Sequence, residues 1–171
     1  MARFLVLLLP LLVGSLSART DPAELERWLE RYLGSWEGEV VVESSDGREL
    51  RRFPVAAEYW RDGGAVLALT AFEINGEMTF VTGRNFLRNG LLFADVTQAG
   101  KTVTYRGYLR GEELYWIPYD AELNTERRMK EWFSEQDGEE VLHVEGIERL
   151  RKPGKGQAKV LLRAKMKRSA R

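Results

Sequence analysis

The pattern of apolar and polar residues changes once along the chain, at Gly34. Before this glycine, five residues follow the three- and four-residue spacing of an amphipathic helix: Leu25, Trp28, Leu29, Tyr32 and Leu33. Asp21 and Pro22 precede them as a typical N-cap and first helical residue. We therefore expect a single short helix within residues 19–33, with its apolar stripe packed against the rest of the protein.

After Gly34, turn signals divide the chain into segments of strand length. Pairs such as Asn75-Gly76, Asn89-Gly90 and Asp137-Gly138 favour hairpin turns, and the segments between them are rich in Val, Thr, Tyr, Phe and Trp. An open meander of this length would expose two strand edges, whereas closure removes both. The predicted fold class is mainly β: an up-and-down antiparallel barrel of about ten strands over residues 34–168, with one N-terminal helix.

The first and last predicted strands carry opposite charges on their outer faces. Glu37, Glu39 and Glu43 alternate with an inward set that begins at Trp36, while Lys165 and Lys167 belong to the basic outer face of the last strand. Opposite charges stabilise neighbouring strands, so this pattern favours closure of the first strand against the last.

Closure of the barrel would also bring Trp36 close to Arg168. Arg168 continues the inward set of the last strand, and a guanidinium can stack on an indole ring beneath the helix. The alternative is that the strand frays first, so that Arg168 joins the solvated basic C-terminal end, residues 169–171.

The first eighteen residues have the three regions of a signal peptide. Arg3 supplies the basic region, residues 4–14 are apolar, and Ser15 and Ser17 suit a cut after Ser17, with a cut after Ala18 as the alternative. The apolar run is shorter than the roughly 20 residues of a membrane span. We expect an exported protein, periplasmic or secreted, with no stable membrane anchor after cleavage.

Composition limits the classes of function. The 171 residues suit one domain, the net charge of zero gives no reason to expect a nucleic-acid partner, and the absence of cysteine excludes disulfides and thiolate chemistry. Nothing in the composition indicates an oligomeric state.

The segment Leu33-Gly34-Ser35-Trp36 resembles the Gly-x-Trp start of the calycin superfamily, which includes lipocalins and fatty-acid-binding proteins. In that superfamily a short helix closes one end of the barrel and the tryptophan opens the first strand. The whole chain is most similar to exported bacterial lipocalin-like families of unknown function. The resemblance implies the same arrangement here over residues 22–168.

The chain offers few residues of the kinds that form metal or cofactor sites. His143 is the single histidine, and with no cysteine a metal site would depend on carboxylates such as Glu145. The start Gly34-x-Trp36-x-Gly38 also resembles the nitrobindins, which bind haem through a histidine on the last strand, but residues 158–168 contain none. We expect no metal and no cofactor, and binding is favoured over catalysis.

Alternating polar and aromatic residues on three predicted strands are the candidate ligand site. The six candidates are Arg84, Phe86, Arg106, Tyr108, Tyr115 and Tyr119. Facing inward, they would line a cavity for a small amphipathic or apolar ligand; facing outward, they would form a solvated sheet face. A protein or glycan interaction module with a packed barrel is the alternative function, and a haem-binding barrel is a further one.

Overall fold

The computed structural model describes residues 21–119, 128–152 and 156–169. The expected signal peptide, residues 1–18, and the last two residues of the basic C-terminal end lie outside these ranges. In chain order the elements are α1 (Pro22–Tyr32), β1 (Gly34–Ser44), β2 (Glu49–Asp62), β3 (Ala65–Ile74), β4 (Glu77–Arg88), β5 (Leu91–Gln98), β6 (Lys101–Arg110), β7 (Glu113–Pro118), β8 (Arg128–Gln136), β9 (Glu139–Lys152) and β10 (Gly156–Arg168).

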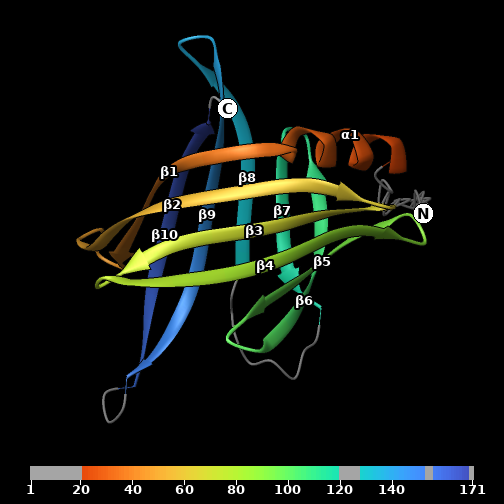
Figure 1. The fold of residues 1–171 in the computed structure, drawn as a ribbon. Coiled ribbons are helices and arrows are strands. Elements are labelled where there is room, and N and C mark those ends of the chain that lie inside the picture. The colour runs from red at the N-terminus through yellow and green to blue at the C-terminus, as the bar shows by residue number, and fades with distance from the viewer. Residues whose placement is uncertain (1–20, 120–127, 153–155, 170–171) are drawn as a thin grey trace, which may run out of the picture.

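The ten strands form one closed antiparallel barrel. Each strand pairs with its neighbours in sequence, and β10 pairs with β1 to complete the ring. The predicted fold class, a mainly β up-and-down barrel with a helix near the N-terminus, is therefore confirmed. In Figure 1, β1–β4 cross in front of β7–β10 at a steep angle. No helix in the described ranges combines the length and hydropathy needed to cross a membrane.

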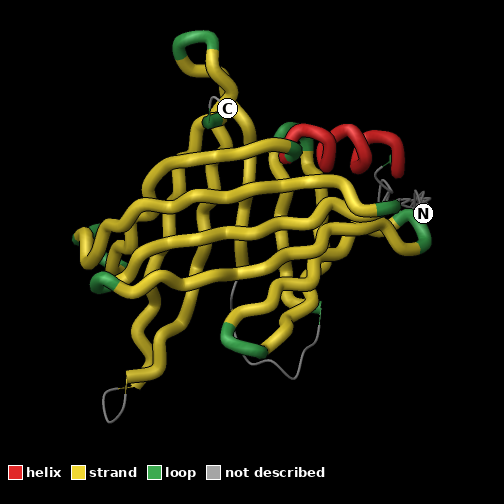
Figure 2. The backbone as a smooth tube through the Cα atoms, viewed as in Figure 1, coloured by secondary structure: helices red, strands yellow, loops and turns green. Residues whose placement is uncertain are grey.

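The barrel has two distinct ends. We call the end that holds α1 and the start of β1 the helix end, and the opposite end, with the β1–β2 and β3–β4 turns, the mouth end. Tight turns join the long strands, as Figure 2 shows in green. Asn75, Asn89 and Asp137 adopt positive φ angles of 55–56° before a glycine, because their hairpin turns require this conformation.

The apolar stripe of α1 is buried at the helix end. Leu25, Trp28, Leu29 and Tyr32 are all at most 4% exposed, as the spacing predicted. The carboxylate of Asp21 accepts a hydrogen bond from the Ala23 amide at 3.0 Å, which caps the first turn. The helix therefore owes its position to the barrel core, since eleven residues would be marginally stable in isolation.

The seam between β1 and β10 closes the barrel. Its register runs from Trp36 opposite Arg168 to Ser44 opposite Val160. On the outer face, Arg163 forms an ion pair with Glu43 at 2.8 Å, so the acidic and basic faces meet as the sequence predicted. Exposed pairs of this kind contribute little individually, and the backbone ladder and buried faces supply most of the stability.

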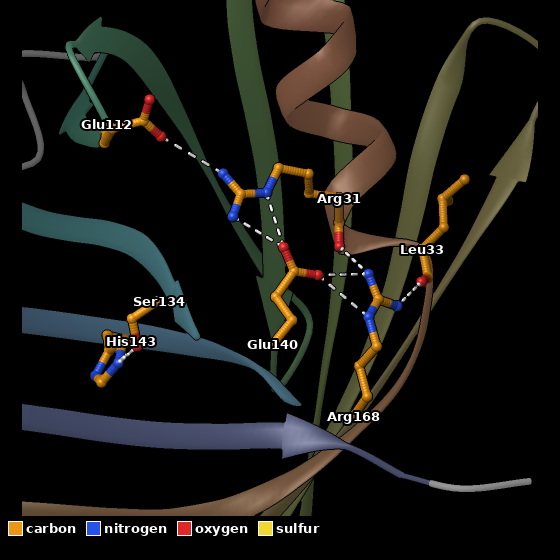
Figure 3. A network of polar contacts seen from close by, with 7 residues as sticks. All are labelled: Arg31, Leu33, Glu112, Ser134, Glu140, His143 and Arg168. Carbon is orange, nitrogen blue, oxygen red and sulfur yellow. Dashed lines mark hydrogen bonds and ion pairs between the residues drawn. The ribbon is translucent and has the colours of Figure 1, made fainter. Parts of the chain in front are cut away.

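Arg168 joins the seam to the helix. Its guanidinium lies 4.5 Å from the centroid of the Trp36 ring, in the stacked position expected from the sequence. It also donates to the carbonyl of Leu33 at 2.5 Å and to that of Arg31 at 2.7 Å, where the positive charge suits the helix C-terminus. Glu140 accepts from both Arg168 and Arg31, which completes the network in Figure 3.

We predict measurable energetic coupling between Trp36 and Arg168. A double-mutant cycle with Trp36→Phe and Arg168→Met is expected to give a coupling of about 1 kcal/mol in the free energy of unfolding, because the smaller ring attracts the guanidinium less strongly. Urea denaturation of the four proteins measures it. The pair Trp36→Phe and Arg163→Met is the control and should be additive; coupling near zero for Arg168 would contradict a stabilising stack.

Candidate functional site: the interior cavity

The barrel encloses a cavity of about 580 Å³. Its walls are mainly aliphatic and aromatic side chains from β1, β2, β3, β9 and β10, including Val40, Phe53, Val55, Phe72, Val144 and Leu162. These residues lie on the inward faces set by the strand register. The size and the apolar lining match those of small-molecule sites.

The cavity opens at the mouth end. Leu50, Arg51 and Gln98 line it there and are themselves exposed, Leu50 by 47%. Leu50 lies at the irregularity in the β1–β2 register, after which Arg51 faces Val42 across the strands. A molecule can therefore reach the apolar interior from this side, past one cationic side chain.

Glu131 of β8 forms the deep end of the cavity. The hydroxyl of Tyr32 and the indole N–H of Trp116, at 3.0 Å, both donate to its Oε2. Trp28 donates in turn to the Tyr32 hydroxyl at 3.2 Å, which links this carboxyl group to the helix. Tyr59 stacks on Tyr32, with ring centroids 5.1 Å apart.

Burial raises the pKa of Glu131, although the hydrogen bonds from Tyr32 and Trp116 act in the opposite direction. The residual accessible surface of Glu131 faces the cavity that it lines. Burial, and then the nearby Glu131 carboxylate, also raise the pKa of Tyr32 and that of Tyr59. The deep end of the cavity thus disfavours negative charge.

We predict that Glu131 makes stability fall as the pH rises. A raised folded-state pKa stabilises the protein below the unfolded value of about 4.5, and this contribution is lost as the pH rises through the folded value. The free energy of unfolding of the wild type should therefore decline relative to that of Glu131→Gln from pH 4.5 upward. Urea denaturation at a series of pH values tests this; parallel pH profiles would contradict it.

The six residues predicted to line a cavity lie on the outer face instead. Arg84 and Phe86 alternate with the inward Gly83 and Asn85. Likewise, Arg106, Tyr108 and Tyr115 alternate with inward residues of β6 and β7. Tyr119 follows the end of β7 and is 57% exposed, and none of the six is among the described lining residues. The inward placement is therefore wrong, and the outward alternative describes these strands.

One reason for this error is that a glycine lies on the inward face of β4 and another on that of β6. Gly83 and Gly107 face inward, where a Cβ on Gly107 would lie 2.8 Å from Leu92, so this part of the interior is filled by its neighbours. The two arginines lie outside and stack on neighbouring aromatic rings: Arg84 lies 4.5 Å from the Phe86 centroid and Arg106 lies 4.7 Å from that of Tyr108. On these strands, the apolar or polar character of a residue therefore does not indicate whether its side chain points into the barrel.

Sequence reasoning missed both charged residues that line the cavity in the described part of the chain, Arg51 and Glu131. A signal for them exists. Glu131 alternates with Met129 and Phe133, and Arg51 with Phe53 and other apolar residues, so each is a charge on an apolar strand face. A charge in that position indicates either a partner or a ligand site.

His143 lies on the outer face of β9, away from the cavity. Its Nε2 is 2.8 Å from the Ser134 hydroxyl, as Figure 3 shows, and its ring stacks on Trp132 with centroids 4.8 Å apart. Partial burial, and then the charge of Lys165, lower its pKa below the usual 6.5. Within the described ranges, no three histidine or carboxylate side chains gather as metal ligands would.

Several solved structures resemble the barrel, and two of them illustrate the likeness. A protein of unknown function from the DUF3598 family of Nostoc punctiforme superposes with a TM-score of 0.61 at 16% identity, over 82% of this chain and 49% of that one. This chain thus spans about half the length of that protein. An S-type phycobiliprotein lyase from Guillardia theta superposes with a TM-score of 0.53 at 8% identity, over 86% of this chain and 93% of that one.

Sequence comparisons add nothing to these likenesses. No protein-family model matches the chain, and no curated protein matches it. Identities of 16% and 8% establish a shared fold and no more. The chain is therefore similar in architecture to a DUF3598 protein and to a phycobiliprotein lyase, both of which share its antiparallel barrel design.

Proposed function

We propose that this protein binds a small amphipathic or apolar ligand inside its barrel. The observation that carries the proposal is the cavity of about 580 Å³ with apolar walls and an open mouth. A small molecule bound in this space would have much of its apolar surface removed from water, which favours binding. An interaction module with a packed barrel, the alternative from the sequence, would instead have a filled interior.

A fluorescent apolar probe tests the proposal directly. The fluorescence of 1-aminoanthracene should rise on mixing with the wild-type protein, because its quantum yield increases in an apolar site. Ala164→Phe, on the cavity wall, should weaken this binding at least about tenfold, since the added ring occupies the space the probe needs.

Ala71→Phe is the matched control. Ala71 lies on β3 next to the lining residues Thr70 and Phe72, so its side chain is on the opposite face of the strand. This variant should bind the probe as the wild type does. Equal binding by wild type and Ala164→Phe, or no binding by the wild type, would reject the interior site.

Export is a second part of the proposal and rests on the sequence of residues 1–18. A ligand-binding barrel with this leader would bind its ligand outside the cytoplasm, in the periplasm or the medium. Mass spectrometry of protein recovered from those fractions should find a mature N-terminus at Ala18 or Arg19. Recovery of the chain with Met1 intact from outside the cytoplasm would contradict the cleavage.

A further inference from the structure

The two charged residues that line the cavity in the described part of the chain lie at opposite ends of it. Arg51 lies at the mouth, and Glu131 lies at the deep end, next to Tyr59 of the same strand as Arg51. Along β2 the two ends are eight residues apart, or about 26 Å at 3.3 Å per residue. The cavity is therefore elongated and electrically asymmetric.

Arg51 lacks a partner among the described residues, in contrast to its neighbour. Arg52, on the outer face, pairs with Glu39 at 3.0 Å and with Glu49 at 2.8 Å. The arginines at the helix end and on the β10 seam are also paired, as Arg31, Arg61, Arg163 and Arg168 show. At Arg51 the described part of the chain supplies no carboxylate within ion-pair distance, so its guanidinium donors are available to a ligand.

The deep end excludes an anion. The carboxyl group of Glu131 already accepts from Tyr32 and Trp116, and the surrounding walls are apolar. A negative group placed there would lie beside another acid and among apolar walls, which is unfavourable. The raised pKa of Glu131 agrees with this, since the site resists even its own charge.

From this geometry we infer that the ligand is an anionic amphiphile whose acidic head lies at Arg51 and whose apolar body extends toward Glu131. The inference rests on the proposed function and adds the charge and the orientation of the ligand. A planar guanidinium binds a carboxylate, sulfonate or phosphate head with two parallel hydrogen bonds, and the strand walls bury the body. A cationic head at Arg51 would be repelled.

Three probes of equal chain length distinguish the effect of the head-group charge from that of burying the apolar chain. They are dodecanoate, 1-dodecanol and dodecylamine, each kept below its micelle-forming concentration. Their affinities follow from displacement of 1-aminoanthracene. We expect dodecanoate to bind about fivefold or more tightly than 1-dodecanol, and dodecylamine to bind more weakly than either, because only the head group differs. The preference for dodecanoate should shrink as salt is added, since the mouth is solvent-exposed.

Arg51→Met and Arg52→Met form the matched pair of variants. Both remove one guanidinium from adjacent positions on β2, but only Arg51 lines the cavity. Arg51→Met should reduce the affinity for dodecanoate about fivefold and leave that for 1-dodecanol within about twofold. Arg52→Met should leave both affinities unchanged.

The outcomes distinguish this inference from the proposed function. Equal binding of the three probes, tighter binding of dodecylamine, or equal losses of dodecanoate and 1-dodecanol affinity in Arg51→Met would overturn the anionic head while the interior site stands. Failure of 1-aminoanthracene itself to bind the wild type would overturn both. Far-UV circular dichroism and urea midpoints confirm that the variants are folded.

Discussion

Replacing Gly38 with alanine is expected to lower the free energy of unfolding by about 3 kcal/mol or more. A Cβ at this position would lie 1.9 Å from the carbonyl oxygen of Lys165 and 2.8 Å from the Cα of Met166. Both atoms belong to the backbone of β10, so no side-chain rotation can relieve the overlap. The strand itself has to move, at the seam that closes the barrel.

Gly146→Ala is the control for the Gly38 variant. Gly146 also faces the interior, on β9, but the nearest atoms to a Cβ there are side-chain carbons of Leu162 and Met129 at 3.6 Å. This is ordinary contact, and a change within about 1 kcal/mol is expected. Urea denaturation gives both values. In the Gly38 variant, amide hydrogen exchange should become faster first in β1 and β10. If the Gly38 and Gly146 variants were equally stable, the close approach of β1 and β10 at Gly38 would be contradicted.

Trp28→Ala is expected to cost about 3–5 kcal/mol, the usual range for removing a buried aromatic side chain. Trp28 is 4% exposed, and its ring centroid lies 5.2 Å from that of Phe133 on the barrel wall. Its indole N–H also donates to the Tyr32 hydroxyl, so the variant weakens the chain of bonds that leads to Glu131. The helix would lose one of the four buried side chains that pack it against the barrel.

Trp60→Ala provides the comparison for Trp28. Trp60 is 42% exposed on the outer face of β2, and its loss should change the free energy of unfolding by about 1 kcal/mol or less. Thermal or urea denaturation of the two variants measures the difference. If Trp28→Ala were no more destabilising than Trp60→Ala, the helix would be only loosely docked.

Local sequence patterns determined the elements of this fold. The spacing of Leu25, Trp28 and Leu29 defined the helix stripe, and pairs such as Asn75-Gly76 defined the hairpins. These signals are local because helix period, capping and turn conformation depend on residues close together in the chain. An uninterrupted series of hairpins leaves the backbone groups of the first and last strands unpaired unless the sheet closes on itself. Closure pairs β1 with β10 and so removes both free edges.

The residues that line the cavity could not be predicted from local sequence patterns. Alternation identifies two faces of a strand, but which face is inward depends on the neighbours that fill the interior. On β4 and β6 the inward residues Gly83 and Gly107 are small because Ala68, Leu92 and Trp116 already occupy that space. Arg84, Phe86, Arg106 and Tyr108 therefore have the outward orientation, the second of the two that their alternation allowed, and do not form the candidate ligand site.

What the sequence determined by itself was a helix, ten strands and their order around a closed barrel, because these follow from period, turns and edge pairing. Tertiary structure decided where the interior stays open. It placed Arg51 at the mouth and joined Glu131 to Tyr32 and Trp116, residues separated by up to 99 positions in the chain. Such contacts depend on how side chains from many strands together fill the interior of the barrel. A local sequence pattern concerns only residues close together in the chain, so it does not predict this packing.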